Sequence, residues 1–158
     1  MRRIGHLAES TGEKFTMNSP KTIEHMREQM TDNGKAKLDD ALSSGRDPKV
    51  RLHGKGEDFY LTGKGSGRYL TDEHPGKTPL ERKENLQLPP GNDAKDVDKV
   101  RSTSARPLIE SKINPQEDWA KESGYKPREG MKQIITPTRD GEAPMASGMY
   151  ENLGNADK

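Results

Sequence analysis

Apolar residues change their spacing partway along this chain, and the change divides it into two unlike parts. Over residues 20–33 and again over 35–45 they recur every three or four positions, which places them on one face of a helix. Asn33 and Gly34 stand between the two runs and are typical of a helix end. The first part therefore predicts two short helices in a hairpin, preceded by an arm without periodicity over residues 1–17.

The second part has short apolar runs punctuated by glycine, which predicts brief strands joined by turns. Such runs occur over residues 50–71, at Val97–Val100, at Leu108–Ile113 and in the stretch GMKQIITP that begins at Gly130. We expect these strands to form a small sheet that is split and strongly curved.

One helix is expected among these strands, in the stretch TPLERKENLQLPP. Thr78 is a suitable N-cap, Pro79 fits the first helical position, and Glu81 completes a capping box. Leu80 and Leu86 are expected to pack inward. The double proline that follows ends the helix.

The order of these elements predicts an α+β fold, in which a small, curved, split β-sheet follows a short helical hairpin. We divide the chain into an N-terminal arm and hairpin at residues 1–47, a main domain at 48–138 and a loose C-terminal tail at 139–158. The tail is rich in glycine, aspartate and asparagine, which are typical of loops.

Composition limits how much of the chain a core can order. Hydrophobic residues make up 27% of the 158 positions and charged residues 34%, whereas ordinary globular chains carry roughly 45–50% apolar residues. Ordering the backbone costs about 1–2 kcal/mol per residue. We therefore expect a modest core, with other segments extended or supported by a partner.

The charges are nearly balanced, with 27 basic and 26 acidic side chains and a net charge of +1. Nucleic-acid binding draws most of its affinity from a basic surface, which the chain as a whole does not have. No stretch approaches the roughly 20 apolar residues that span a bilayer. Stable membrane insertion is therefore not expected.

Metal chemistry is not expected either. The chain has no cysteine, which removes thiolate ligands and disulfides. The histidines, His6, His25, His53 and His74, are scattered, and none pairs at the spacing of a zinc site. The stretch GKGSGR that begins at Gly63 lacks the Walker pattern, and its glycines are typical of a tight turn or of a backbone that passes close to a ligand.

Arginine, tyrosine and glutamine side chains are the candidate binding groups. Arg51, Arg68 and Arg82 lie in one stretch of loops and short elements, and a guanidinium binds phosphate through two parallel hydrogen bonds. Tyr69 follows Arg68 directly, so in a strand only one of the two faces a cleft. Gln133 opens an apolar strand after a glycine turn, where its amide could hold a substrate amide or a water. Tyr69 and Gln133 also have plain structural interpretations, as a half-buried strand tyrosine and as a strand-edge glutamine.

In sequence order these pieces are Arg-x-x-Gly, Gly-Arg-Tyr-Leu-Thr, an arginine-bearing helical turn with Leu-Pro-Pro, Ile-Asn-Pro-Gln and Gly-x-x-Gln. The series resembles the tuberculosis-necrotizing-toxin family of NAD glycohydrolases, which occur as C-terminal domains of bacterial secreted and contact-dependent toxins. The resemblance spans residues 50–137, and the GRYLT and LPP stretches carry most of it. It implies a split β-fold related to ADP-ribosyltransferases. It also implies hydrolysis of the nicotinamide–ribose bond of NAD or NADP as substrate, without a metal or other cofactor.

The resemblance further implies roles for individual residues. Arg51 and Arg82 match the arginines that bind the phosphates. Arg68 is the alternative to Arg51, because Arg51 lies further from the tyrosine than the family's pattern has it. Tyr69 matches the aromatic residue that closes on the nicotinamide ribose. Gln133 matches the catalytic glutamine, although the run of three glycines that usually precedes it is here reduced to one.

Toxins of this kind are secreted or delivered into a target cell, act in its cytoplasm and travel with a cognate immunity protein that blocks the site. The helical hairpin would then be a linker or uptake segment. Three other functions stay open. Glu110, Glu117 or Glu122 could serve an ADP-ribosyltransferase toxin. Lysine and arginine side chains could serve a toxin nuclease acting on tRNA or DNA. The low apolar fraction would suit a non-enzymatic polar adaptor or structural protein.

Overall fold

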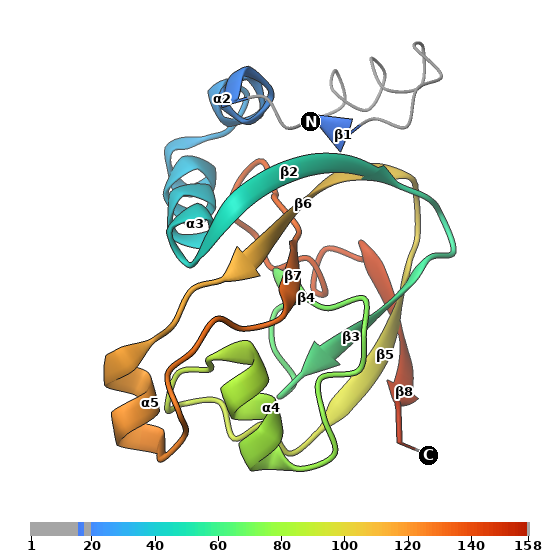
Figure 1. The fold of residues 1–158 in the computed structure, drawn as a ribbon. Helices are drawn as coiled ribbons and strands as arrows, with labels where there is room; N and C mark the ends of the chain where they lie inside the picture. Colours follow the sequence, from blue (N-terminus) through green and yellow to red (C-terminus); the bar gives the residue numbers. More distant parts are fainter. Residues whose placement is uncertain (1–15, 18–19, 158) are drawn as a thin grey trace.

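A computed structural model describes residues 16–17 and 20–157 of the chain, which form four helices and eight strands (Figure 1). The helices are α2 (Pro20–Glu28), α3 (Asp32–Ser43), α4 (Pro79–Leu86) and α5 (Glu117–Ser123). The strands are β1 (Thr16–Met17), β2 (Gly45–His53), β3 (Asp58–Thr62), β4 (Tyr69–Leu70), β5 (Val97–Ser102), β6 (Arg106–Ile113), β7 (Lys132–Ile135) and β8 (Tyr150–Asn155). Within the described residues, no helix combines the length and the apolar character needed to cross a bilayer.

The strands form two antiparallel sheets, and neither closes on itself. The larger sheet has the order β1-β2-β6-β7-β4, and the smaller has the order β3-β5-β8. An isolated bridge between Tyr60 and Thr71 joins the two where β3 passes β4. In Figure 1, β2 arches over β6, β7 and β4 of the larger sheet. The predicted α+β fold with a split sheet is therefore confirmed.

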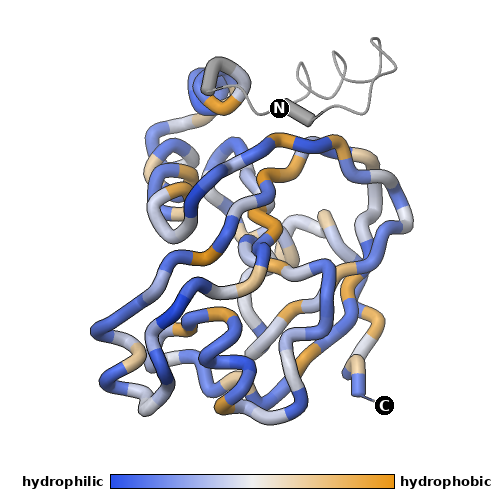
Figure 2. The backbone as a smooth tube through the Cα atoms, viewed as in Figure 1, coloured by the Kyte–Doolittle hydropathy of each residue, from blue (hydrophilic) through white to orange (hydrophobic). Residues whose placement is uncertain are grey.

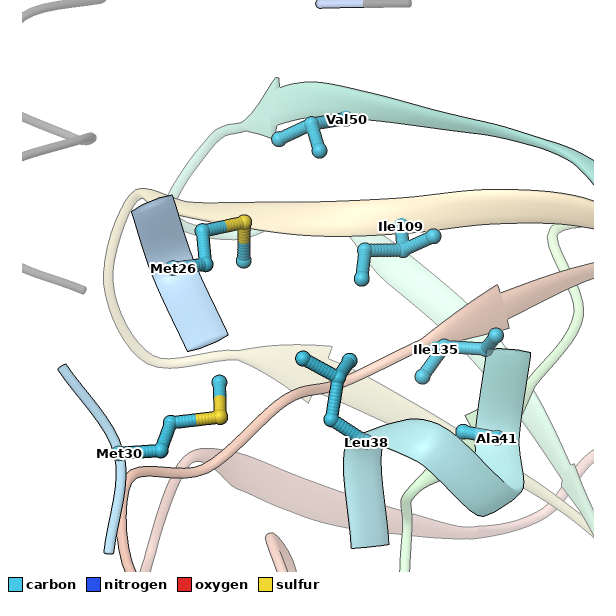
Figure 3. Packing of buried hydrophobic residues seen from close by; sticks show 7 residues of the cluster. All are labelled: Met26, Met30, Leu38, Ala41, Val50, Ile109 and Ile135. Atoms are coloured by element: carbon cyan, nitrogen blue, oxygen red, sulfur yellow. The ribbon is translucent and has the colours of Figure 1, made fainter. Parts of the chain in front are cut away.

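The helical hairpin of α2 and α3 covers one face of the larger sheet. Val50, Ile109 and Ile135 are successive cross-strand neighbours on that face, and they pack against Met26 and Leu38 of the helices (Figure 3). Burying one such side chain contributes about 1.5–3 kcal/mol. The hairpin is therefore held to the sheet by a core of its own.

The smaller sheet covers the opposite face. Leu70, Leu108 and Ile134 of the larger sheet pack there against Phe59 and Val100 of the smaller one. Figure 2 shows the consequence of the sparse apolar composition, since short hydrophobic stretches alternate with long hydrophilic ones along the tube. The core is thus two thin layers on either side of one sheet.

The turn of the hairpin differs from the prediction. Glu28 ends α2, and Thr31 caps α3 by accepting a hydrogen bond from the Gly34 amide at 3.2 Å, so Asn33 and Gly34 lie inside α3. A Cβ at Gly34 would stand 2.0 Å from the carbonyl oxygen of Arg139. This glycine permits a close approach of the C-terminal segment, and reading it as a helix end was wrong.

Residues 139–157 are folded, where the sequence predicted a loose tail. Strand β8 pairs with β5, and the buried Tyr150 hydroxyl lies 2.7 Å from Oγ1 of Thr136. The Asn33 side chain donates to the carbonyl of Asp140 at 2.8 Å. The polar composition was misleading because edge pairing and one buried ring are enough to order this segment.

Two further predictions concern helices. Thr78 caps α4 and accepts from the Glu81 amide at 3.2 Å, as predicted. Leu86 is buried, but Leu80 is 56% exposed, so the inward packing of Leu80 was wrong. Helix α5 was not predicted. The expected boundary at residue 48 falls inside β2, and of the predicted arm only Thr16–Met17 lie within the described residues.

Candidate active site

Tyr69 and Gln133 project from the same face of the larger sheet. Tyr69 lies opposite Ile135, and Gln133 lies opposite Ser111. Opposed residues share a face, and so do residues two apart on one strand. Tyr69 and Gln133 are therefore diagonal neighbours, about 7–8 Å apart, on the face that the helical hairpin covers.

A cleft of about 240 Å³ at the β4 edge of this sheet contains both side chains. Its walls come from the end of α3, from β3 and β4 with their connecting loop, from the end of α4 and from α5. Besides Tyr69 and Gln133, the polar and aromatic lining includes Ser44, Gln87 and Trp119. Among the described residues, the lining has no carboxylate, guanidinium, ammonium or imidazole group.

The amide of Gln133 is fixed by two serines. Its Nε2 donates to Oγ of Ser44 at 3.1 Å and to Oγ of Ser111 at 2.9 Å. The Ser44 hydroxyl donates to the carbonyl of Ala41 at 2.7 Å, so it accepts from Gln133. This settles which end of the amide is nitrogen. Oε1 of Gln133 meets no donor in the described part of the chain and can accept a hydrogen bond from a ligand.

Two aromatic rings stand at the mouth of the cleft. Tyr69 is 43% exposed and Trp119 is 38% exposed, although both line the cleft. Burial of the phenol raises the pKa of Tyr69, an effect that neighbouring Arg68 partly opposes. Tyr69 is therefore a neutral hydrogen-bonding group at neutral pH. Large aromatic side chains left half open around a polar cleft are suited to stacking against a flat ligand.

Arg82 and Arg68 are engaged elsewhere. The Arg82 side chain is 6% exposed, and its guanidinium donates to the carbonyls of Gly76 at 2.9 Å and Ala94 at 2.9 Å. The Arg68 guanidinium donates to the carbonyl of Gly141 at 2.9 Å. Both arginines satisfy buried or half-buried backbone oxygens that would otherwise lack donors. Of the neighbours Arg68 and Tyr69, it is the tyrosine that faces the cleft.

Arg51 lies on the other face of the sheet. It is opposite Leu108, which packs against the smaller sheet, and its Nε is 3.3 Å from Oε1 of Glu110. With Glu110, Lys49 and Lys132 it lines an open groove of about 880 Å³. The structure thus brings Tyr69 and Gln133 together and leaves Arg51, Arg68 and Arg82 outside their cleft.

Several cleft residues were missed by the sequence analysis. Trp119 is the chain's single tryptophan, and its place in a polar stretch with glutamates was a usable signal of an exposed ring. Ser44, Gln87 and Gln116 carry no sequence signal, because only the tertiary fold brings them to the cleft. Among the described residues no group of three or more His, Cys, Asp or Glu is arranged to hold a metal ion.

No protein-family model matches the chain, and no curated protein matches it. Its fold is similar to that of Rhs1-CT, solved in complex with its cognate immunity protein RhsI1, with a TM-score of 0.53 and 14% identity over 69% of this chain and 80% of that one. Tse6, solved in complex with Tsi6, aligns over 83% of this chain and 96% of that one, with a TM-score of 0.47 and 16% identity. The likeness to Rhs1-CT establishes a shared fold.

Proposed function

We propose that this chain is a bacterial toxin effector domain that hydrolyses the nicotinamide–ribose bond of NAD or NADP. The observation that carries the proposal is the convergence of Tyr69 and Gln133 in one uncharged cleft with an aromatic rim. The resemblance to the tuberculosis-necrotizing-toxin family assigns roles to the same two residues, and Rhs1-CT, whose fold the chain shares, was solved with a cognate immunity protein, as expected for a toxin of this kind.

The cleft suits this reaction chemically. Oxidised nicotinamide is a flat cation, and the electron-rich faces of Tyr69 and Trp119 favour such a ring. When the C–N bond breaks, its electron pair goes to the ring nitrogen and neutralises the pyridinium, so no strong acid is needed. Oε1 of Gln133 can accept a hydrogen bond from the attacking water or a ribose hydroxyl and hold it in line. The water oxygen bonds to the anomeric carbon, and its proton passes to solvent.

The phosphates then require a holder other than the three arginines. The loop over residues 63–67 forms part of the cleft wall, and the amides of Gly65 and Gly67 meet no acceptor in the described part of the chain. Thr62 lines the same wall, is buried, and its Oγ1 has no hydrogen-bond partner. Backbone amides and hydroxyls of this kind bind anions without a cationic side chain, and we assign the diphosphate to this wall.

The carboxylates bear on the transferase alternative. Glu110 lies beside Arg51 on the opposite face of the sheet, and Glu117 and Glu122 are exposed on α5 outside the cleft lining. A cleft that orients water with an amide, with no carboxylate to activate an acceptor, favours hydrolysis over ADP-ribosyl transfer.

The proposal includes a partner and a place of action. Rhs1-CT was solved with its cognate immunity protein, and a domain that depletes NAD would harm the cell that makes it. We therefore propose a cognate immunity protein in the producing cell and delivery of this domain into the cytoplasm of a target cell.

The test is nicotinamide release from NAD and from NADP by the purified chain, with Gln133→Ala beside it and an RNA-degradation gel run in parallel. We expect release of nicotinamide by the unsubstituted chain, little release by Gln133→Ala, and intact RNA. Degraded RNA with intact NAD would instead identify a nuclease. Intact RNA and intact nucleotides would leave the adaptor function, and nicotinamide release that requires an acceptor protein would identify a transferase.

A further inference from the structure

We propose that Ser44 is a positioning residue for Gln133, and that the helical hairpin is therefore part of the working machinery of the cleft rather than a linker or uptake segment. The predicted changes in kcat and KM rest on the proposed hydrolysis of NAD or NADP. It names a residue of α3's C-terminal end that neither the sequence resemblance nor the fold comparison points to.

The hydrogen bonds around the Gln133 amide have a defined direction. The Ser44 hydroxyl donates its hydrogen to the carbonyl of Ala41 at 2.7 Å, so Ser44 Oγ acts as the acceptor for Nε2 of Gln133 at 3.1 Å. Ser111 receives the other Nε2 hydrogen at 2.9 Å. With both N–H groups held, Oε1 can point only one way. Ser44 itself lines the cleft, so the constraint acts at its wall.

Ser44 is held in place by its own backbone. Its amide bonds back to the carbonyl of Ala41 as the C-cap of α3, and its carbonyl accepts from the amide of Asn114, just beyond β6, at 3.0 Å. Ala41 and Leu38 are buried in the core that fastens the hairpin to the sheet. The hydroxyl that orients Gln133 is therefore fixed from the helix side and from the sheet side.

The space around Gln133 and the two serines is tightly filled. A Cβ at Gly45 would stand 2.6 Å from Oγ of Ser111 and 2.8 Å from Nε2 of Gln133. Real Cβ atoms do not approach polar atoms that closely, so the chain passes through this point only with glycine. The Ser44–Gly45 step is thus fitted around the amide of Gln133.

Ser44→Ala tests the proposal, and Ser43→Ala is its matched control. Ser43 is the preceding serine, its hydroxyl likewise donates to the carbonyl three residues back at 2.8 Å, and it is exposed. Both changes remove one hydroxyl from the end of α3, but only the Ser44 hydroxyl is hydrogen-bonded to Gln133. Ser44→Thr keeps the hydroxyl and serves as the conservative variant.

We expect Ser44→Ala to lower kcat for nicotinamide release about fivefold to tenfold, since one positioning hydrogen bond is lost. KM should change by less than about twofold, because substrate binding does not use this bond. Ser44→Thr should recover most of kcat, and Ser43→Ala should leave it unchanged. Equal effects of Ser44→Ala and Ser43→Ala, or an unchanged kcat in Ser44→Ala, would overturn the proposal.

A second readout does not depend on activity. The side-chain amide protons of Gln133, identified by their loss from the NMR spectrum of Gln133→Ala, should exchange with solvent faster in Ser44→Ala and at the original rate in Ser43→Ala. If the unsubstituted chain releases no nicotinamide, the proposed function fails, and this exchange measurement still decides whether Ser44 positions Gln133. An exchange rate unchanged in Ser44→Ala would refute the positioning role.

Discussion

The two hollows of this molecule differ in their chemistry. The cleft around Tyr69 and Gln133 has no charged side chain among its described lining residues. The groove around Arg51 is lined largely by charged ones, which are Asp47, Lys49, Arg51, Glu110, Lys112 and Lys132. Two of the cations in the groove are already paired, with Arg51 Nε 3.3 Å from Glu110 Oε1 and Lys132 Nζ 2.7 Å from Asp72 Oδ2.

The comparison shows that residue type alone does not decide which side chains share a hollow. Arg51 and Tyr69 stand on opposite faces of one sheet because their strands are in a register that puts Leu108 and Ile135 opposite them. A shift of one residue exchanges the two faces. Parity of position, which the sequence does not display, decides which side chains can meet.

Substitutions at Gln133 and at Arg51 show which of the two hollows binds the substrate. Gln133→Ala should lower kcat for nicotinamide release about a hundredfold or more, as loss of a positioned polar group in the transition state does. Arg51→Ala should leave kcat and KM within about twofold, because the Arg51–Glu110 ion pair that it removes lies outside the cleft. Steady-state kinetics on both variants checks this. A larger loss in Arg51→Ala than in Gln133→Ala would move the substrate to the groove.

Arg82→Ala should act on stability. Its guanidinium is buried among backbone carbonyls, and losing charged hydrogen bonds of this kind costs about 2–3 kcal/mol in free energy of unfolding. Urea unfolding measures the loss, and KM of the fraction that remains folded should be unchanged. Full stability combined with a raised KM would show instead that Arg82 binds the phosphates.

The aromatic rim predicts a smaller effect on binding. Trp119→Ala should raise KM for NAD about fivefold to tenfold, the range expected when one stacking partner of a flat base is removed. Trp119→Phe should keep most of the affinity because it keeps a ring. A KM that does not respond to Trp119→Ala would place the nicotinamide away from α5.

The smallest effect concerns alkaline pH. Burial raises the pKa of Tyr150 and of Tyr69, so the folded state holds their protons more tightly than the unfolded state, in which a tyrosine titrates near about 10. The stabilisation is complete below about pH 10 and is lost as pH rises through the folded-state values. Urea unfolding across this range should show a shallower alkaline decline for Tyr150→Phe than for the unsubstituted chain. An equally steep decline in both would contradict it.

Local signals were enough to predict part of this structure. Helix α4 was predicted because Thr78, Pro79 and the double proline lie within one short stretch, and β5 and β6 were predicted because their apolar residues recur within a few positions. Strand β8 was missed because it forms by pairing with β5, which lies about 50 residues earlier in the sequence. In this pairing Val100 is opposite Asn152 and Arg101 is opposite Glu151. Tertiary contacts of this kind leave little trace in one sequence.

The candidate site was predictable to the same extent. Tyr69 and Gln133 came from a motif series, and the fold puts them in one cleft. Arg82 and Arg68 were assigned to phosphates because guanidinium groups bind them, but buried carbonyls need the same donors. Ser44 was invisible, since a helix-end serine has many roles and only the fold carries it to Gln133.

The most direct measurement uses Trp119, the chain's single tryptophan, which lines the cleft. Titrating Gln133→Ala, which should bind NAD without turning it over, with NAD should change the indole fluorescence in a saturable way. The double variant Gln133→Ala with Tyr69→Ala should give a weaker fluorescence response. The double variant Gln133→Ala with Arg51→Ala should give the same response as Gln133→Ala alone. Fluorescence that does not respond to NAD, or a response that Arg51→Ala removes, would contradict an uncharged cleft as the binding site.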